Sequence, residues 1–453
     1  MKLERSSAEL KKAPIRIVHI GLGAFHRAHQ AWYTNLVDTN KEWGIAAFTG
    51  RNPEAAEKLN SQDNLYTLIE RGPERDNFSL ISAISASHDI DDYWRLKEYI
   101  GDPIIAMITL TITEAGYHLN SAGNLDRDNS LVDEDLENLF IEDYVPHTIL
   151  FKLTSGLVKR YKLNGKPITI LSCDNVAANG VRLQAAMSEI FSFLPPEIDT
   201  WFKSAVAFPS SSVDRITPRT TEKDLEIVRE VTGFSDCTPV VTEPFSNWII
   251  QGAFPAGRPA WENAGAIFVN EIEPFENRKL WLLNGAHSLM AYAGLNQGIA
   301  TVADAMKSSD IRALVEAFWA EASTLLPAPE LQLDDYKKAL ISRFENHRIE
   351  HQLPQIAIDG ATKLTYRAVP VIKALLKNGE FPDASAHLIA QWVKFCLNNA
   401  EIVDSRSAEI GLATASLDPI QACISILDLG LSENTSFVTY VKNVIKNQEA
   451  ISE

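Results

Sequence analysis

A lysine, an asparagine and a histidine, Lys279, Asn284 and His287, lie close together in one helix-compatible segment. At about 100° per residue, these side chains fall at roughly 0°, 140° and 80° around a regular α-helix, so they share one side of it. Leucines flank that side. Burial there would lower the pKa of the lysine toward a pH at which it can exchange protons.

These three residue types suit hydride chemistry. Oxidation of a secondary alcohol needs a group that accepts the hydroxyl proton while the carbon-bound hydrogen leaves as hydride, and the reverse reaction needs the same group as an acid. Lys279 can fill that role, Asn284 can hold the reacting oxygen, and a neutral His287 can orient the lysine or a hydroxyl. A solvated helix surface carries the same residue types, so the trio alone leaves both interpretations open.

A second candidate site is the turn from Gly21 to His26. It has the first two glycines of the dinucleotide-binding fingerprint, Gly21 and Gly23, while His26 takes the place of the third. The first glycine permits a tight turn, and the second lets the backbone approach a pyrophosphate at the start of a helix. A plain strand-to-helix turn uses glycine in the same way. The position of this turn, after the first strand of a βαβ unit, favours the nucleotide site.

The end of the second predicted strand usually carries an acid for the adenosine ribose. Here it reads Thr49-Gly50-Arg51-Asn52, without an acid. Arg51 can pair with a 2′-phosphate, stack on adenine or lie in solvent. The residues therefore leave both NAD and NADP open as cofactors.

Two regions of the chain must position these residues. Strands are predicted at 15–20, 44–49, 66–69, 78–84, 104–113, 168–172 and 205–208, with 66–69 and 78–84 as an antiparallel excursion. Their alternation with helical segments predicts a doubly wound, mostly parallel sheet. Beyond Pro274, long helices are predicted at 275–295, 311–325, 334–344, 384–397 and 419–427. The fold class is thus α/β, with a Rossmann-type domain over 1–270 and a mainly helical domain over 271–453.

The composition narrows the class of partner. The chain has 453 residues, with 42 Lys plus Arg against 59 Asp plus Glu, so its formal charge is −17. Such a charge disfavours binding to nucleic acid and to anionic membrane surfaces. Four separated cysteines, Cys173, Cys237, Cys396 and Cys423, and an N-terminus unlike a signal peptide predict a reduced, cytoplasmic protein. A monomer and a homodimer are both compatible with the sequence.

Several motifs occur in an order that is typical of one enzyme family. They are Gly21-Leu22-Gly23-Ala24-Phe25-His26-Arg27-Ala28-His29-Gln30, Thr113-Glu114-Ala115-Gly116-Tyr117, Ser172-Cys173-Asp174-Asn175, Val213-Asp214-Arg215-Ile216-Thr217-Pro218, Thr242-Glu243-Pro244-Phe245 and the helix with Lys279, Asn284 and His287. Over nearly its whole length the chain resembles the polyol-specific long-chain dehydrogenase/reductase family, which includes mannitol 2-dehydrogenases and fructuronate reductases.

The resemblance implies an NAD(P)-dependent secondary-alcohol dehydrogenase without a catalytic metal. It assigns Lys279 as general acid/base, Asn175 and Asn284 as the pair that polarises the reacting oxygen, and His287 as a substrate-placing residue. Asp214 and Lys363 match positions that contact the far hydroxyls. The predicted cofactor-binding residues are Gly21, Gly23, Ala24, Phe25, His26, Arg27, Arg51 and Thr111. NAD is the expected cofactor, with NADP as the alternative.

Alternatives remain at the level of substrate and class. Mannitol–fructose chemistry is preferred, and mannonate–fructuronate chemistry differs at the far end, where a carboxylate replaces a hydroxymethyl group. A pocket cation, Lys363, Arg367 or Arg215, would decide between them. His26 and His29, three residues apart, also suggest a zinc enzyme as an alternative, although no third ligand is found at a recognisable spacing. A non-catalytic nucleotide-binding regulator is a more distant possibility.

Overall fold

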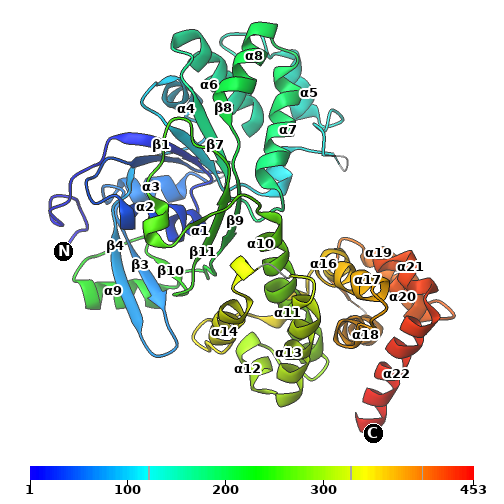
Figure 1. Cartoon of the computed structure of the whole chain (residues 1–453). Helices are drawn as coiled ribbons and strands as arrows, with labels where there is room; N and C mark the ends of the chain where they lie inside the picture. The colour runs from blue at the N-terminus through cyan, green and yellow to red at the C-terminus, as the bar shows by residue number, and fades with distance from the viewer. Residues whose placement is uncertain (51, 121–122, 327–328, 400, 453) are drawn as a thin grey trace. The chain divides into compact units, whose positions relative to one another are not determined.

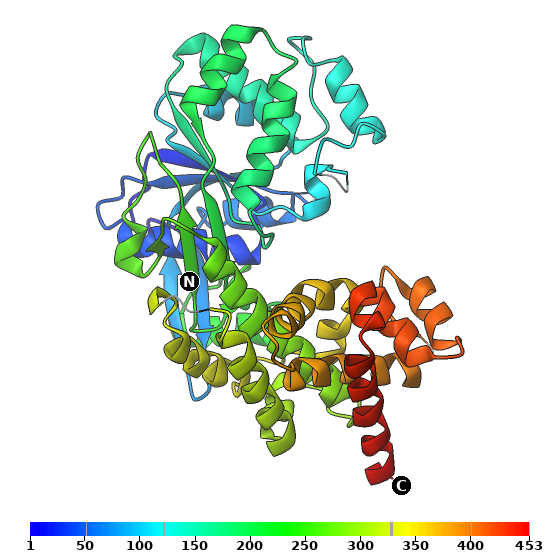
Figure 2. The same ribbon diagram turned by 45° about the vertical axis from the view of Figure 1, so that its right-hand side comes forward.

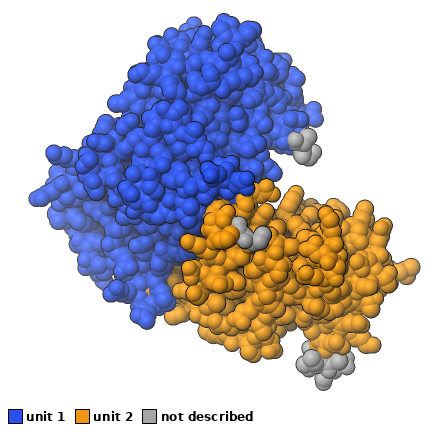
Figure 3. Space-filling view, in the orientation of Figure 1, with its two compact units in different colours: residues 1–272 blue, residues 273–453 orange. Residues whose placement is uncertain are grey.

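A computed structural model describes residues 1–50, 52–120, 123–326, 329–399 and 401–452 of the chain. These residues form two compact units, Met1–Ile272 and Glu273–Glu453 (Figure 3). Within the described ranges, every helix is too short or too polar to cross a lipid bilayer.

A six-stranded sheet forms the centre of unit 1 (Figure 1). In spatial order its strands are β5 (Ile84–His88), β2 (Gly44–Phe48), β1 (Ile15–Ile20), β6 (Met107–Leu110), β7 (Ile168–Ser172) and β8 (Val206–Ala207). Each neighbouring pair is parallel. Counted along the chain, this is the order 3-2-1-4-5-6 of the doubly wound dinucleotide-binding fold, which confirms the predicted Rossmann-type architecture.

Alternate residues of the central strands enter two separate cores. In β1, Ile17 packs on one face of the sheet, while Val18 and Ile20 pack on the other. Both faces are therefore covered, as in other parallel sheets, and most strand residues are buried. The helices of unit 1 are α1 (Ala24–Ala28), α2 (Gln30–Val37), α3 (Glu54–Asn60), α4 (Tyr93–Gly101), α5 (Ser130–Glu137), α6 (Ile149–Leu163), α7 (Asn179–Phe191), α8 (Pro196–Ala205) and α9 (Glu222–Thr232), with 3-10 helices at Glu114–Tyr117 and Trp261–Ala264.

Two small sheets complete unit 1. One has the order β10 (Val240–Thr242), β3 (Tyr66–Arg71), β4 (Asp76–Ile81), and the other has the order β12 (Ile267–Phe268), β11 (Asn247–Gln251), β9 (Ser210–Asp214). The antiparallel excursion is confirmed as the β3–β4 hairpin, which projects as a ribbon in Figures 1 and 2. The predicted second strand, 78–84, was too long. It ends at Ile81, and Ile84 begins β5, which instead joins the main sheet beside β2.

Unit 2 consists of helices. They are α10 (Glu273–Arg278), the π-helix η3 (Lys279–Gly285), α11 (Ala286–Leu295), α12 (Val302–Lys307), α13 (Ser309–Ser323), a 3-10 helix at Pro329–Leu331, α14 (Leu333–Phe344), α15 (Leu353–Ala357), α16 (Gly360–Arg367), α17 (Val369–Lys377), α18 (Asp383–Asn398), α19 (Ser407–Thr414), α20 (Pro419–Leu427), α21 (Leu429–Glu433) and α22 (Thr435–Ser452). The mainly helical prediction is confirmed. The segment predicted as one regular helix over 275–295 is α10, η3 and α11 in continuous succession.

Candidate active site

The turn from β1 into α1 is built around Gly21. Its φ is +109°, and a Cβ at this position would lie 2.0 Å from the carbonyl oxygen of Thr111. The amides of Gly21 and Leu22 both donate to the carbonyl of Phe48, each at 2.9 Å. At Gly23, in contrast, the nearest neighbour of a Cβ would be the Gly21 carbonyl at 3.7 Å. The first glycine therefore fixes the turn, and the second leaves room for a phosphate group to approach the backbone.

Two stacked histidines, His19 and His26, lie next to this turn. The ring of His26 is fully buried and lies on that of His19, with centroids 3.3 Å apart and planes at 9°. Thr111 donates through its hydroxyl to the Gly21 carbonyl at 2.8 Å and lies 3.0 Å from Nε2 of His19. Burial lowers the pKa of His19 to about 3, and burial followed by the nearby His19 lowers the pKa of His26 well below its usual value. Both rings are therefore neutral.

Arg27 points into the body of unit 1. Its guanidinium donates to the carbonyl of Thr238 at 2.6 Å and to the Thr238 hydroxyl at 2.9 Å, and it lies 5.4 Å from the ring centroid of Tyr66. Arg27 is one of the residues expected to bind cofactor. In the structure its side chain links α1 to the segment before β10. Ala24 and Phe25 are both half-buried at the start of α1.

The two histidines of the His26–His29 pair have different surroundings. The ring of His29 packs against Phe25, Tyr33 and Trp248, and its Nε2 lies 3.2 Å from the carbonyl oxygen of Asn247. Neither histidine has further His, Cys, Asp or Glu side chains grouped around it in the way a metal site requires, within the part of the chain that the structure describes. Both rings instead contribute to the packing of α1 and α2.

The edge of the sheet beyond β2 contains an acid that sequence analysis missed. Arg51, predicted to contact cofactor, lies outside the described residues. Asp89, which follows β5, accepts a hydrogen bond of 3.4 Å from the hydroxyl of Thr49 at the end of β2. The expected acid position directly follows the second strand, whereas Asp89 comes from the neighbouring strand. Asp89 could have been found by predicting that the strand before it, β5, pairs with β2 in the main sheet.

Asn175 is exposed and follows the buried Asp174 in the loop after β7. The buried carboxylate of Asp174 accepts hydrogen bonds from the amide of Ile112 at 2.5 Å, from the hydroxyl of Ser172 at 2.9 Å and from the hydroxyl of Tyr117. Burial raises the pKa of Asp174 to about 6, against the effect of these hydrogen bonds. The motifs at 113–117 and 172–175 thus meet at this carboxylate, which belongs to the residue before Asn175.

Asp214 and Arg215 follow one another at the end of β9, and both are buried. The guanidinium of Arg215 donates to Glu70 at 2.6 Å and to the carbonyl of Ala28 at 2.6 Å, and it lies 4.1 Å from a ring centroid of Trp32. Of the three candidate pocket cations, Arg215 is therefore committed to an ion pair inside unit 1.

In unit 2, the π-helix η3 changes the relation between Lys279 and Asn284. In a π-helix each turn closes between residues i and i+5, so it contains more residues than the 3.6 of an α-helix. Asn284 is five residues after Lys279 and consequently returns to nearly the same side, instead of lying about 140° away. The regular-helix geometry predicted from the sequence was wrong here, because the two half-buried residues lie on a π-helix.

His287 follows in α11 and is buried. Its ring contacts those of Phe344 and His351, with centroids 5.0 Å and 4.9 Å away. Burial, followed by the charges of His351, Arg343 and Arg367, lowers the pKa of His287 well below its usual value. Burial also lowers the pKa of His351 to about 4. His287 is therefore neutral.

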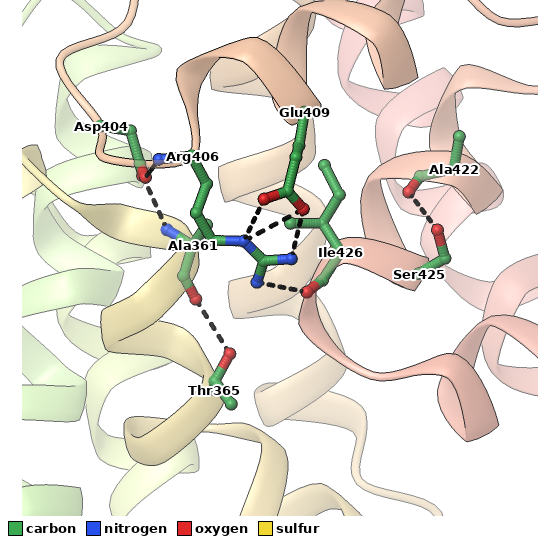
Figure 4. Close-up of polar contacts among 8 residues, drawn as sticks. All are labelled: Ala361, Thr365, Asp404, Arg406, Glu409, Ala422, Ser425 and Ile426. Atoms are coloured by element: carbon green, nitrogen blue, oxygen red, sulfur yellow. Dashed lines mark hydrogen bonds and ion pairs between the residues drawn. The ribbon is translucent and has the colours of Figure 1, made fainter. Parts of the chain in front are cut away.

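Helix α16 carries Lys363 and Arg367. Its first turn is held by Asp404, whose carboxylate accepts from the amide of Ala361 at 2.9 Å (Figure 4). Lys363 donates to the carbonyl of Ile356 at 3.1 Å, and burial, with Arg367 second, lowers its pKa. Arg367 donates to the carbonyl of Asn284 at 3.2 Å, so α16 and the helix with the predicted catalytic residues are directly connected.

Each unit thus gathers its own set of predicted site residues. In unit 1, the register pairs Ile20 with Leu110 and Leu110 with Ser172, so Gly21, Thr111 and Asn175 follow the carboxyl ends of adjacent strands. This edge is where open α/β sheets bind their ligands. In unit 2, Lys279, Asn284 and His287 follow one another on a continuous helix, with Arg367 against its backbone.

The fold and these motifs define the class of protein: an oxidoreductase that acts on secondary alcohols and combines a Rossmann-type unit with a helical unit. Family models give its place within that class. The mannitol dehydrogenase Rossmann domain matches residues 15–263, and the mannitol dehydrogenase C-terminal domain matches residues 271–448. The chain belongs to the mannitol dehydrogenase family.

Relatives and solved structures agree with this assignment. The D-mannonate oxidoreductase of Escherichia coli strain K12 is 34% identical, over 97% of this chain and 94% of its own. The mannitol 2-dehydrogenase of Neosartorya fischeri is 35% identical, over 81% of this chain and 75% of its own. A substrate-free D-sorbitol dehydrogenase has a TM-score of 0.89 at 27% identity, covering 100% of this chain and 98% of its own. The Pseudomonas fluorescens mannitol 2-dehydrogenase, in a ternary complex with NAD and D-mannitol, has a TM-score of 0.81 at 29% identity. The match covers 99% of this chain and 97% of that chain.

Proposed function

We propose that this protein interconverts a polyol and its 2-ketose, of the mannitol and fructose type, with NAD as the preferred cofactor. The observation that carries the proposal is the π-helix η3, which turns Lys279 and Asn284 to nearly the same side of one helix. The glycine turn of unit 1 supplies the other requirement, because Gly23 leaves space for a pyrophosphate at the edge of the sheet.

The proposed cofactor supplies or accepts the hydride when it is bound. Gly21, Gly23, Ala24 and Phe25 would hold its phosphates at the start of α1. Asp89 supports NAD over NADP, because a carboxylate near the end of β2 repels a 2′-phosphate and can bind a ribose hydroxyl. NADP remains the alternative because Arg51 follows Thr49 and Gly50 in the sequence.

The chain's own residues have distinct proposed roles. Nζ of Lys279 takes the hydroxyl proton in oxidation and returns it in reduction. The side-chain amides of Asn175 and Asn284 donate to the reacting oxygen, on which negative charge develops. His287, kept neutral by burial, orients a substrate hydroxyl. Asp214 and Lys363 contact the far hydroxyls.

A second substrate class, mannonate with fructuronate, has specific support. Two half-buried cations, Lys363 and Arg367, lie one helical turn apart on α16, and Arg367 contacts the backbone of Asn284. A carboxylate at the far end of the substrate would suit such cations. The 34% identity with a D-mannonate oxidoreductase over nearly the whole chain points the same way.

A side-by-side assay decides between these substrates. The purified protein is given fructose or fructuronate, each with NADH and with NADPH, and kcat/KM is measured. We expect turnover of fructose with NADH. A higher kcat/KM for fructuronate would assign the sugar acid instead, and no turnover of either ketose would contradict both proposals.

We also propose that the enzyme needs no metal, works in the cytoplasm and is a monomer or a homodimer. Lysine and asparagine side chains supply the proton transfer and charge stabilisation that a metal would otherwise provide. All four cysteines are free thiols, which suits a reducing compartment. Activity that survives a metal chelator, and a mass of one or two chains by light scattering, are the expected results.

A further inference from the structure

The change from η3 to α11 alters which backbone carbonyls receive an amide hydrogen bond. In the π-helical turns each amide bonds the carbonyl five residues earlier, whereas in α11 it bonds the carbonyl four residues earlier. Where the i−5 pattern of η3 changes to the i−4 pattern of α11, one carbonyl oxygen accepts no hydrogen bond from a backbone amide. A buried carbonyl without an amide partner is costly unless another group donates to it.

Two side chains from separate helices donate to carbonyl oxygens of η3. Nε1 of Trp319, on α13, donates to the carbonyl of Leu282 at 2.6 Å. The guanidinium of Arg367, at the end of α16, donates to the carbonyl of Asn284 at 3.2 Å and to the hydroxyl of Ser288 at 3.0 Å. Both of these carbonyls belong to η3, and Ser288 lies in the first turn of α11.

Close packing and charge favour these contacts. Trp319 is 2% exposed, and its neighbour Phe318 approaches so closely that a Cβ on Gly285 would lie 2.6 Å from the phenyl ring. Burial lowers the pKa of Arg367 to about 10, so its guanidinium keeps its charge at neutral pH. A charged donor gives a stronger hydrogen bond to a carbonyl than a neutral one does.

We propose that Arg367 and Trp319 are positioning residues that maintain the π-helical turn, and thereby keep Asn284 on the same side of the helix as Lys279. Without these donors, the regular α-helical pattern would satisfy the backbone better. Asn284 would then rotate toward about 140° from Lys279, and the amide would leave the oxygen that Lys279 protonates. The inference rests on the proposed role of Lys279 as general acid/base.

The test uses the full-length variants Arg367→Met, Arg367→Lys and Trp319→Phe. Because small displacements of reacting groups reduce turnover strongly, we expect kcat to fall by about 10- to 100-fold in Arg367→Met and Trp319→Phe. The pH profile of kcat should shift with it, and the dissociation constant of NADH should change by less than about twofold. Arg367→Lys, which keeps one charged donor, should restore part of kcat.

Hydrogen exchange gives a readout apart from activity. Backbone amides of residues 279–289 should exchange faster in Arg367→Met and Trp319→Phe, with the rest of unit 2 unchanged. Matched controls are Arg406→Met, which removes an arginine that donates to the Ile426 carbonyl and pairs with Glu409 (Figure 4), and Trp392→Phe, which alters a buried tryptophan of α18. These controls should leave both exchange at 279–289 and the pH profile as they are.

The outcomes separate this inference from the proposed function. If Lys279→Ala is inactive while Arg367→Met and Trp319→Phe keep the parent kcat, pH profile and exchange, the positioning role is wrong and the proposed function stands. If Lys279→Ala keeps full turnover, the proposed acid/base role itself is wrong. If Arg367→Met does not fold, Trp319→Phe and Arg367→Lys carry the same comparison.

Discussion

The two units hold their candidate groups by different means. In unit 1, Gly21, Thr111 and Asn175 follow strand ends, so the main-chain hydrogen bonds of a parallel sheet place them. In unit 2, Lys279 and Asn284 lie on a π-helix that side chains of α13 and α16 hold from outside. Main-chain hydrogen bonds persist when side chains are substituted, whereas hydrogen bonds from side chains are lost with the residues that donate them. Single substitutions should therefore affect the chemistry of unit 2 more sharply than that of unit 1.

The largest effect is expected from Lys279→Ala. Removing a general acid/base typically costs about 10²- to 10⁴-fold in rate, so kcat for ketose reduction should fall by that factor. NADH should bind with nearly unchanged affinity, since the glycine turn belongs to unit 1. Steady-state kinetics and a calorimetric titration with NADH measure the two quantities. A variant that keeps parental kcat and an unchanged pH profile would sink the assignment.

Two glycine variants test unit 1 as a matched pair. Gly21→Ala forces a Cβ to within 2.0 Å of a backbone oxygen at φ +109°, and should lower the free energy of unfolding by at least about 1–3 kcal/mol. Gly23→Ala meets little steric resistance from the protein and should fold normally, yet bind NADH more weakly. Urea unfolding and NADH titration distinguish them. If Gly23→Ala binds like the parent, the nucleotide does not approach that residue.

Both units contain histidines whose pKa is lowered by burial, which makes the stability of each unit depend on pH. The folded pKa values of His19 and His351, about 3 and about 4, lie below the unfolded value of about 6.5. Between these values the unfolded chain binds more protons, so stability is present above pH 6.5 and is lost as the pH falls toward 4.

His351→Phe should therefore lose less stability than the parent between pH 6.5 and pH 4.5. The difference should be of the order of 2 kcal/mol, because each unit of pKa difference corresponds to about 1.4 kcal/mol. Urea unfolding at pH 7.0, 5.5 and 4.5 measures it. His347→Gln, which changes an exposed histidine, is the control. If His351→Phe and the parent lose the same stability at low pH, His351 does not contribute to the pH dependence.

The smallest effect is expected at Asp89. Asp89→Asn removes the negative charge beside the end of β2 but keeps a similar shape and an acceptor for Thr49. The ratio of kcat/KM for NADPH to that for NADH should rise several-fold, toward a factor of about ten for each 1.4 kcal/mol of repulsion removed. An unchanged ratio would place this carboxylate away from the adenosine ribose.

The sequence predicted those parts that depend on local patterns. Short apolar runs that end in glycine or polar residues identified β1 and β7 with their observed bounds, and the helix Pro419–Leu427 was also correct. The candidate residues at strand ends follow from the same patterns, since a parallel sheet brings its carboxyl ends to one edge. The main sheet of unit 1, apart from β5, could therefore be described from the order of its strands and turns, whereas the strands β9 to β12 were not predicted.

Features set by distant contacts could not be predicted. The π-helix depends on Trp319 and Arg367, which lie 37 and 83 residues from the carbonyls they bind. Asp89 reaches Thr49 only because β5 pairs with β2. The inward direction of Arg27 is decided by Thr238, a residue 211 positions away. None of these partners has a local sequence signal at the position it affects.

The small sheet of β3, β4 and β10 has a consequence for synthesis on the ribosome. Leu68 of β3 pairs with Val240 of β10, so a strand made early waits for one made more than 150 residues later. At about 5–20 residues per second, translation leaves the outer edge of the β3–β4 hairpin unpaired for roughly ten seconds or more. During that interval the exposed strand is open to wrong partners. Slower translation before residue 240 should therefore lower the yield of native protein, and a chaperone that covers strand edges should restore it.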